Sequence, residues 1–323
     1  MNSQSHSQSY AISDSLRGLI ALGRRLFEDS SLSRDSSLSC ATCHKPSNAF
    51  AEPRTVSHGI GLRARRRNSP SLINIVIGRV NFDWDGRAHA LGEQVRNVFS
   101  ASGDMGIDLG EAVRRIRLDR SYRREFRYVL RRSPDSRGFV DALVAFQESL
   151  IVAESRFDRF LLASDSSALS EAELRGWQVF RRKGSGCAGC HSPFTNPRDP
   201  RVIVFSDGRF HNLGVGYENG RMSDVGRYAV TQQPSDWGAF RTPTLRNVAL
   251  TAPYMHDGSL ATLEEVVAFY ARGGNPNPGI DDVMTKRDFT DQDQADLVAF
   301  LKALTTEWLS DSASVRRRLL PTL

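Results

Sequence analysis

The sequence predicts a mainly α-helical protein of two domains, and three observations support this fold class. Several stretches place apolar residues at helical spacing, whereas strand signals are few and the best one covers residues 202–205. A Gly-x-x-x-Phe segment followed by a Cys-x-x-Cys-His motif occurs twice. With 323 residues, the chain is long enough for two domains that each bury a core.

The repeat sets the expected domain boundary. Its copies begin at residues 23–27 (GRRLF) and 176–180 (GWQVF), and in each copy an amphipathic helix leads into the cysteine loop. Between the copies, the polar stretch 163–167 (ASDSS) indicates a linker. We therefore expect an N-terminal domain over residues 1–165 and a C-terminal domain over residues 166–323.

Further helices are expected in both domains. Residues 111–132 and 139–162 mix charged and apolar residues at helical spacing and fit the first domain. Near the end of the chain, apolar residues at positions i, i+3, i+4 and i+7 form one helix face: Leu297, Phe300, Leu301 and Leu304. Long loops at 46–71 and 192–243 separate the helices, and loops of this length usually serve a site.

Composition and charge exclude several classes of protein. Hydrophobic residues make up 40% and charged residues 25%, which is typical of globular proteins. No run approaches the roughly 18 apolar residues of a membrane span, so we expect a chain that does not cross a membrane. The net charge of +6 comes almost entirely from arginine, with clusters at 65–67 and 131–132. No nucleic-acid-binding motif accompanies them, which favours a solvated basic face or an acidic protein partner over nucleic acid.

The four cysteines all belong to two Cys-x-x-Cys-His motifs, residues 40–44 (CATCH) and 187–191 (CAGCH). This spacing lets two thiols add to the vinyl groups of one porphyrin while the adjacent histidine takes an axial position on iron. The two motifs predict two covalently bound haem c groups, attached at Cys40, Cys43, Cys187 and Cys190, with axial ligands His44 and His191. The alternative is a structural zinc site built from both cysteine pairs, which would leave the two histidines as coincidence.

A set of further motifs resembles the bacterial di-haem cytochrome c peroxidase and MauG family, in order from about residue 15 to 305. The motifs are residues 67–72 (RNSPSL), 82–88 (FDWDGRA), 104–106 (DMG), 240–258 (FRTPTLRNVALTAPYMHDG) and 262–267 (TLEEVV). The resemblance implies two cytochrome-c-like domains, each with one haem. It also implies a periplasmic location, although the first 15 residues show no secretion signal, and we interpret them as a mature or trimmed N-terminus.

The resemblance makes the N-terminal haem the one that reacts with hydrogen peroxide. Gln94 matches a glutamine of the family's open haem face, and Asp104 stands ten positions later, where the family has a glutamate. A carboxylate there can act as general acid–base on peroxide, although aspartate is one methylene shorter than glutamate. A turn residue is the alternative role of Asp104. His58 lies where some members carry a histidine that ligates the resting iron; a surface-loop histidine is its alternative.

The resemblance also assigns the distal ligand of the second haem. Peroxidases of the family have a methionine fourteen positions after the histidine of His-Asp-Gly, and counting from His256 this position holds Tyr270, as in MauG. A capping box at 262–265 starts the helix on which Tyr270 would face inward. A buried structural tyrosine is the alternative role, and Met255 is the rival ligand. A phenolate would give this haem a low reduction potential.

The remaining assignments concern the region between the haems. Trp84 matches an indole that relays electron holes, and its alternative role is a core aromatic. Asn68, Thr251 and Pro253 match residues that supply oxygen ligands to an interhaem calcium ion.

The preferred function is a MauG-like di-haem peroxidase that receives electrons through the C-terminal haem. Its partner would be a small cytochrome, a cupredoxin or a protein substrate. An ordinary cytochrome c peroxidase and a non-catalytic di-haem electron carrier are the alternatives.

Overall fold

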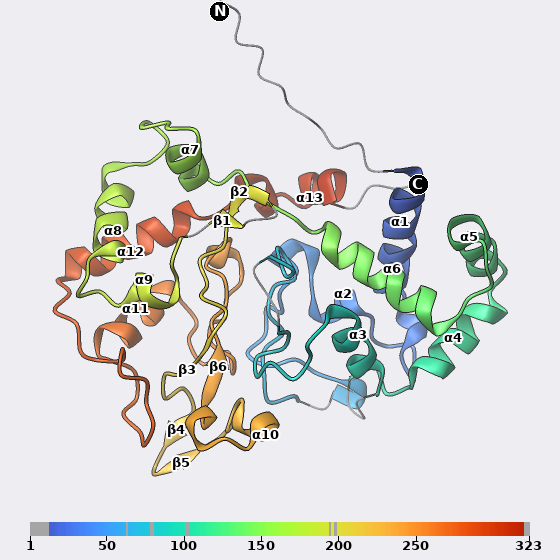
Figure 1. Cartoon of the computed structure of the whole chain (residues 1–323), viewed down its shortest axis with the longest axis horizontal. Helices are drawn as coiled ribbons and strands as arrows, with labels where there is room; N and C mark the ends of the chain where they lie inside the picture. Colours follow the sequence, from blue (N-terminus) through green and yellow to red (C-terminus); the bar gives the residue numbers. More distant parts are fainter. Residues whose placement is uncertain are drawn as a thin grey trace, which may run out of the picture.

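A computed structural model describes residues 13–62, 64–77, 81–100, 104–193, 195–196 and 199–319, so residues 1–12 of the N-terminal segment lie outside the described part. The prediction of a mainly α-helical chain is confirmed (Figure 1). The helices of the N-terminal half are α1 (Asp14–Glu28), α2 (Cys40–Cys43), α3 (Leu91–Ser100), α4 (Leu109–Leu118), α5 (Arg120–Leu130), α6 (Ser136–Ser149) and α7 (Arg156–Leu162). Those of the C-terminal half are α8 (Glu171–Arg181), α9 (Cys187–Cys190), α10 (Tyr228–Thr231), α11 (Leu263–Ala271), α12 (Asp291–Ala303) and α13 (Ser312–Leu319).

Among the residues that the structure describes, the strands form three short antiparallel pairs in the loops of the C-terminal half. They are β1 (Thr195–Asn196) with β2 (Asp199–Ile203), β3 (Phe210–Asn212) with β6 (Ala239–Arg241), and β4 (Tyr217–Glu218) with β5 (Arg221–Met222). The predicted strand at 202–205 is therefore correct only for its first two residues. Within the described ranges, none of the helices combines the length and apolar character that a membrane crossing requires.

Two predicted helices are each divided into two shorter helices by a break in the backbone. Residues 111–132 form α4 and α5, because Asp119 has an extended backbone and its side chain accepts hydrogen bonds from the Ser121 and Tyr122 amides that begin α5. Residues 139–162 form α6 and α7, separated by a segment in which Glu154 has φ +83° and Ser155 caps α7. The predictions of single long helices in these regions were wrong, since helical spacing continues across both breaks while the backbone does not.

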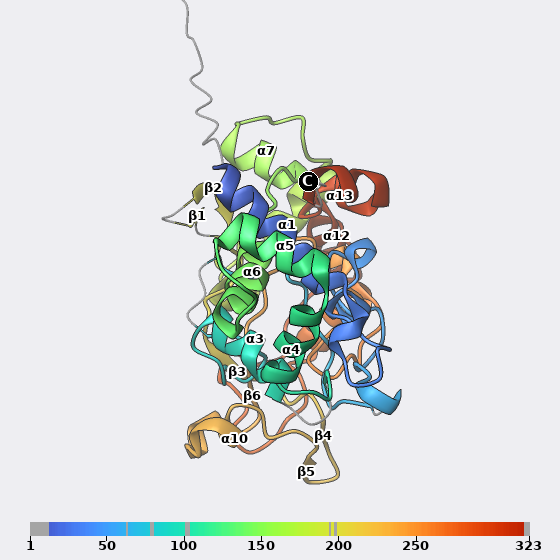
Figure 2. The same ribbon diagram turned by 90° about the vertical axis from the view of Figure 1, so that its right-hand side faces the viewer.

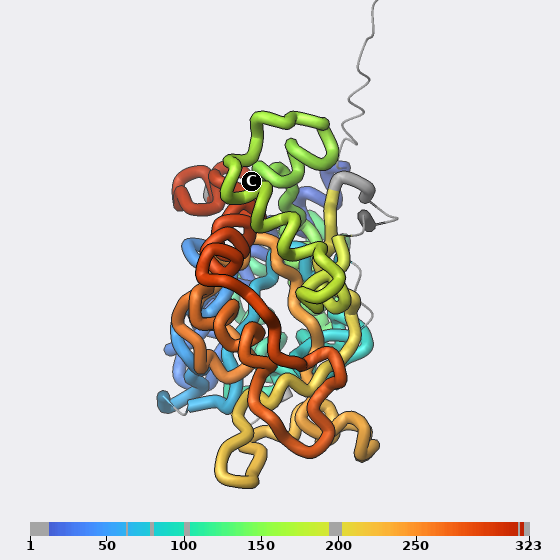
Figure 3. Tube along the Cα trace, turned by 90° about the vertical axis from the view of Figure 1, so that its left-hand side faces the viewer, coloured from blue at the N-terminus to red at the C-terminus, as the bar shows by residue number. Residues whose placement is uncertain are grey.

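The internal repeat has a physical basis in helix crossing. α1 packs against α6 in the N-terminal half, and α8 packs against α12 in the C-terminal half. Figure 3 views the molecule from the side of the C-terminal half and shows α12 in red next to α8 in yellow-green. A Cβ atom on Gly23 would lie 1.9 Å from the Ala142 carbonyl oxygen, and one on Gly176 would lie 1.9 Å from the Asp296 carbonyl oxygen. Each repeat glycine thus lets two helix backbones touch.

The phenylalanine of each repeat continues the same contact one helical turn later. The Phe27 ring centroid lies 5.0 Å from that of Phe146, and the Phe180 centroid lies 5.0 Å from that of Phe300. These four rings are buried at the centres of two separate hydrophobic clusters, one in each half of the chain. The two copies of the repeat therefore lie in two separate cores, and each core is built on an equivalent pair of packed helices.

Two segments pack across the expected boundary at residue 165. Phe157 of α7 belongs to the core of the C-terminal half, whereas Leu309, Val315 and Leu319 from the end of the chain belong to the core of the N-terminal half. The last helix, α13, also contacts the 3-10 turn Pro46–Asn48 that follows the first cysteine motif. The end of the chain therefore ties the two halves together.

Candidate functional site

The second cysteine motif forms a short helix that presents its histidine to a cavity. Cys187–Cys190 is α9, and the His191 amide donates to the Cys187 carbonyl at 2.9 Å. The His191 Nδ1 lies 3.0 Å from the Phe205 carbonyl oxygen, so a proton on Nδ1 leaves Nε2 free as a ligand. Burial lowers the pKa of His191, which favours the neutral ring that can bind a metal.

The first motif repeats this arrangement. Cys40–Cys43 is α2, and the His44 Nδ1 lies 3.1 Å from the Phe50 carbonyl oxygen. Burial again lowers the pKa of His44. The Phe27 ring lies beside this imidazole, with 6.5 Å between the ring centroids, so the repeat phenylalanine packs next to the histidine of the first motif. Both histidines thus have one ring nitrogen occupied by a backbone carbonyl, as an axial ligand requires.

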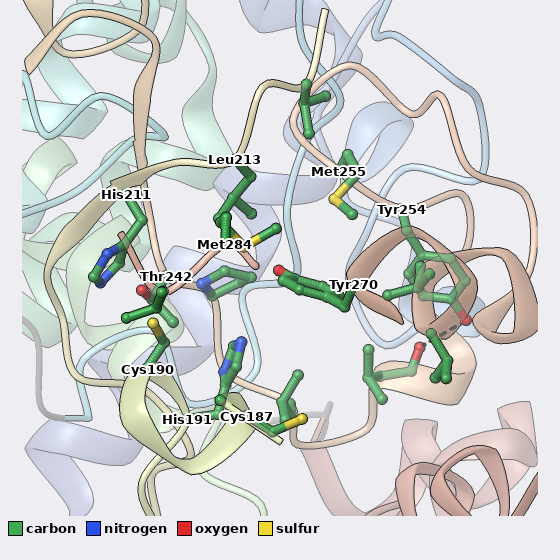
Figure 4. Close-up of a pocket in the computed structure, with 18 of the residues that line it drawn as sticks. Cys187, Cys190, His191, His211, Leu213, Thr242, Tyr254, Met255, Tyr270 and Met284 are labelled. Atoms are coloured by element: carbon green, nitrogen blue, oxygen red, sulfur yellow. Dashed lines mark hydrogen bonds between the residues drawn. The ribbon is translucent and has the colours of Figure 1, made fainter. Parts of the chain in front are cut away.

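A largely apolar cavity lies over α9 in the C-terminal half (Figure 4). The side chains of Cys187, Cys190 and His191 form one side of it, and Tyr270 on α11 projects into it from another. Burial raises the pKa of the Tyr270 hydroxyl above its usual value. Met255, which has φ +71°, lines the same cavity. Both candidate distal ligands therefore reach the space over His191.

His211 at the edge of this cavity is a feature that the sequence did not reveal. Its Nδ1 lies 2.5 Å from Asp281 Oδ2, and its Nε2 lies 2.9 Å from Asp207 Oδ2. A hydrogen bond to Cys190, together with the Asp281 and Asp207 carboxylates, raises the pKa of His211 to about 10. Ligand atoms of His211, Asp207 and Cys190 lie within 4.8 Å of one another, but a thioether at Cys190 would remove the thiolate that a metal site there needs.

The predicted acid–base residue lies in an ion pair in the N-terminal half. Asp104 Oδ1 is 3.0 Å from Arg65 Nη2, and the Asp104 side chain is 30% exposed. Burial raises the pKa of Asp104, whereas Arg65 and Arg87 oppose that shift. A carboxyl group with a raised pKa and a cation beside it can both accept and release a proton.

Gln94, on α3, has a carboxyl neighbour that sequence reasoning missed. Asp83 lies within hydrogen-bond reach of the Gln94 side chain, and burial raises the pKa of Asp83. Arg87 acts electrostatically on both Asp83 and Asp104. The structure therefore brings two carboxyl groups and an amide into the environment of one guanidinium. Because Asp83 stands next to Trp84, its position in the motif could have drawn attention to it.

His58 lies in the loop after the first motif. Its Nδ1 is buried and has no hydrogen-bond partner in the described part of the chain. The buried Glu52 carboxyl group lies near both His58 and Cys43, and burial raises the pKa of Glu52. His58 is thus directed into the protein at a place close to the first cysteine motif.

Trp84 lies between the two halves. It belongs to the N-terminal half, yet it lines the cavity over His191. Its Nε1 donates to the Asn68 carbonyl at 2.8 Å, and its own carbonyl accepts from the Arg241 amide at 2.8 Å. The neighbouring Asp85 pairs with Arg67 at 2.7 Å, and Arg67 pairs in turn with Asp224 of the C-terminal half.

The three predicted calcium ligands come from segments that meet. The Asn68 Nδ2 donates to the carbonyls of Glu52 at 3.1 Å and Arg54 at 2.6 Å, which leaves the amide oxygen of Asn68 available to a cation. The Asn68 amide donates to the His256 carbonyl at 2.7 Å, and so joins the loop that carries Thr251 and Pro253. Oxygen donors of this kind fit a hard cation.

Comparisons with known proteins now identify the family. A family model described as di-haem cytochrome c peroxidase matches residues 17–166. The methylamine utilization protein MauG of Methylorubrum extorquens is 36% identical over 292 residues, which cover 89% of this chain and 78% of that protein. The chain belongs to the di-haem cytochrome c peroxidase family.

Two further relatives agree with this assignment. The cytochrome c551 peroxidase of Nitrosomonas europaea is 33% identical, with 88% of this chain and 79% of that protein covered. The crystal structure of a MauG-like protein associated with microbial copper homeostasis superposes with a TM-score of 0.82 at 34% identity and covers 94% of this chain and 93% of that one. The protein is thus a di-haem c-type peroxidase, an oxidoreductase, and the family recognised from the sequence is confirmed.

Proposed function

We propose that this di-haem peroxidase attaches one haem c in each of two cytochrome-c-like domains, through residues 40–44 and 187–191. The observation that carries the proposal is the shared geometry of His44 and His191, whose Nδ1 atoms both face a backbone carbonyl and whose Nε2 atoms are left as ligands. When bound, haem iron supplies the electron transfer that reduces hydrogen peroxide.

At the N-terminal site, Asp104 would move the proton. Reduction of hydrogen peroxide to two water molecules consumes two electrons and two protons. The Asp104 carboxylate takes a proton from the near oxygen of peroxide and returns it to the departing oxygen. Arg65, at 3.0 Å, opposes the rise in the pKa of Asp104 that burial causes, and so favours the ionised carboxylate. Gln94 would orient peroxide, and the contact with Asp83 would hold its amide in place.

At the C-terminal site, Tyr270 would be the distal ligand opposite His191. Its place on α11 and its projection into the cavity support this role (Figure 4). A phenolate oxygen stabilises the oxidised states of iron better than a thioether does, so this site would accept an oxidising equivalent readily. This is the chemistry that separates a MauG-like peroxidase from an ordinary one.

The region between the sites would couple them. Trp84 reaches the C-terminal cavity from the N-terminal half, which suits an indole that relays electron holes. A calcium ion would be held by Asn68 Oδ1 and the carbonyls of Thr251 and Pro253. It would fix the position of Asn68, whose carbonyl accepts the hydrogen bond from the Trp84 indole.

The proposed setting is the periplasm, where c-type haem proteins of this family work. The oxidised partner would be a protein, as the name of the MauG relative suggests, or a small cytochrome or cupredoxin would serve as electron donor. Hydrogen peroxide is the oxidant.

The first test is covalent haem attachment at each motif. After export with the cytochrome c maturation machinery, the intact mass should show two haem additions that survive acid–acetone extraction. Cys40→Ala/Cys43→Ala and Cys187→Ala/Cys190→Ala should each lose one addition. A protein that retains stoichiometric zinc and no haem would rule the proposal out.

An ordinary cytochrome c peroxidase is the second candidate, and two observations favour it. Met255 lines the same cavity as Tyr270, and the buried Nδ1 of His58 lacks a partner among the described residues. In that case Met255 would ligate the second iron and His58 would block the first one at rest. A methionine–iron charge-transfer band in the oxidised protein would select this candidate.

A further inference from the structure

Two buried arginines of the C-terminal half differ in what compensates their charge. Arg241 is 3% exposed and Arg246 is 4% exposed. The guanidinium of Arg246 pairs with both carboxylate oxygens of Asp158, at 3.0 and 2.8 Å. Among the described residues, the guanidinium of Arg241 donates only to the backbone carbonyls of Asp83 and Thr242, both at 3.3 Å. The two arginines are therefore equally buried, but only Arg246 has an opposite charge beside it.

The charge of Arg241 is poorly compensated by the protein itself. Burial lowers the pKa of its guanidinium to about 10, so the group still carries its proton at neutral pH. Asp83 acts electrostatically against this shift, but none of the carboxylate oxygens in the described ranges lies within 4 Å of Arg241. A buried cation without a counter-charge is unfavourable. An anion from outside the polypeptide would supply the missing compensation.

Arg241 lies at the wall of the cavity over His191. It is the last residue of β6, and its amide donates to the Trp84 carbonyl at 2.8 Å. Figure 1 shows β6 on the side of the C-terminal half that faces the N-terminal half. In Figure 2, which is seen from the side of the N-terminal half, α3 and β6 appear in the same region. Arg241 thus lies where the cavity meets the N-terminal half.

The group that the proposed function places in this cavity brings carboxylates of its own. In haem c, the thioether bonds form at the former vinyl groups, and two propionate side chains extend from the other two pyrrole rings. Attachment at Cys187 and Cys190 would therefore leave the propionates at the opposite edge of the porphyrin. A guanidinium matches a carboxylate in charge and in the geometry of its N–H groups.

We propose that Arg241 binds a propionate of the C-terminal haem and so holds that haem against the segment formed by Asp83 and Trp84. The inference rests on the proposed function only in that a haem occupies this cavity. Arg241 is then a positioning residue, with the propionate on one side and the Asp83 carbonyl on the other. Because the Asp83 side chain contacts Gln94, the same segment extends to the N-terminal site.

A purely structural Arg241 is the alternative. Its hydrogen bond to the Asp83 carbonyl joins the two halves of the chain. That role needs a donor but no charge, and a neutral side chain such as glutamine would fill it without burial of a cation. The buried charge of Arg241 therefore favours an anionic ligand over a structural role.

The test measures the C-terminal haem of the holoprotein rather than turnover. Arg241→Gln keeps hydrogen-bond donors and removes the charge. A buried cation beside the haem favours the reduced iron, so its loss should lower the reduction potential of this haem. We expect a tenfold change in the equilibrium constant of reduction, which is about 59 mV for a one-electron couple. The propionate bending mode in the resonance Raman spectrum should also shift, because this mode responds to hydrogen bonds at the propionate.

Arg287→Gln is the matched control, since Arg287 lines the same cavity near the second cysteine motif. Its guanidinium donates to Thr285 Oγ1 at 2.7 Å and to the Val283 carbonyl, and it acts electrostatically on Cys187. Arg287 thus lies at the edge where the thioether bonds form. Its removal should change the equilibrium constant of reduction by less than about threefold, because water screens a partly exposed charge. The propionate mode should stay in place.

Arg241→Lys provides a second test that does not depend on the fold of the glutamine variant. Lysine keeps the charge but has a single nitrogen in place of the planar fork. The reduction potential should therefore stay close to that of the wild type, whereas the propionate mode should shift.

Two results would overturn the inference. The first is a propionate mode that is the same in the wild type, Arg241→Gln and Arg241→Lys. The second is an equal change of potential in Arg241→Gln and Arg287→Gln, which would make Arg241 one of several distant cations. A failure of the proposed function would look different, because the intact mass of the wild type would then lack the second haem addition.

Discussion

Arg65 and Asp104 form an ion pair, with 3.0 Å between Arg65 Nη2 and Asp104 Oδ1. The pair couples a carboxyl group whose pKa is raised by burial to a cation that lowers it. Arg65 and Asp104 lie in separate loops, and the motifs of the sequence do not link them. Arg65 therefore lowers the pKa of Asp104, the shorter carboxylate that stands where the family has a glutamate, against the effect of burial.

The role of Asp104 is tested with Asp104→Asn, which removes the proton-transfer group and keeps its size. The rate of reaction with peroxide should fall by about 10²–10⁴, the usual contribution of a positioned acid–base group, while both haems stay attached. Stopped-flow absorbance measures this rate. An unchanged rate would make Asp104 a turn residue.

The pH dependence of the same rate tests Arg65. Asp104 must be ionised to accept a proton, so the rate should fall as the pH drops through its raised pKa. Removing the cation in Arg65→Gln raises that pKa further, and the acidic limb of the profile should move to higher pH. Arg54→Gln, which removes a nearby exposed guanidinium of the same loop, is the control and should leave the limb in place.

Tyr270→Phe tests the ligand at the second site, since it keeps the ring and removes the oxygen. The spectrum of that haem should change and its reduction potential should rise, because a phenolate ligand stabilises the oxidised iron. Potentiometric titration with absorbance detection measures both effects. Met255→Leu should leave the spectrum unaltered. If Met255→Leu changes it and Tyr270→Phe does not, the second site is that of an ordinary peroxidase.

Gly23→Ala and Gly176→Ala test the helix crossings that define the repeat. A Cβ atom at either position would lie 1.9 Å from a carbonyl oxygen of the facing helix, so the helices must separate. Each change should lower the free energy of unfolding by about 1–3 kcal/mol or more, as overpacking usually does. Gly184→Ala is the control, since a Cβ there meets no atom within 4 Å. Thermal unfolding that is equal for all three variants would contradict this account of the repeat.

How much the sequence predicts depends on how local each feature is. The cysteine motifs, the helix around Tyr270 and the repeat glycines are short patterns, and the structure has a helix or a close helix contact at each. The hydrogen bond of His211 to Asp281 joins residues 70 positions apart, and no sequence pattern predicts it. The contact of Asp83 with Gln94 joins a loop residue to α3, and the residue spacing alone does not predict it. The sequence does not predict the helix break at Asp119, because the helical spacing of apolar side chains continues through a residue whose backbone is extended.

Trp84 is predicted to couple the two haems electronically. It reaches the cavity over His191 from the N-terminal half and is held by its hydrogen bond to the Asn68 carbonyl, so the indole has a fixed place at the wall of that cavity. The oxidised protein should react with peroxide without prior reduction, and a near-infrared charge-resonance band should show that the oxidising equivalents are shared by both haems. Trp84→Phe keeps an aromatic ring but loses the easily oxidised indole and its hydrogen bond. It should abolish the band and leave haem attachment intact.

The matched control for this prediction is Trp308→Phe. Trp308 is an indole that packs against the N-terminal core and donates to Glu154 at 3.3 Å, so its loss should leave the band unchanged. A band that persists in Trp84→Phe would make Trp84 a core aromatic only. A different outcome is an oxidised wild type that stays inert until one electron is supplied. The first iron is then blocked at rest, and the unpartnered imidazole of His58 is the side chain to test, because His58→Ala should make the oxidised protein reactive at once.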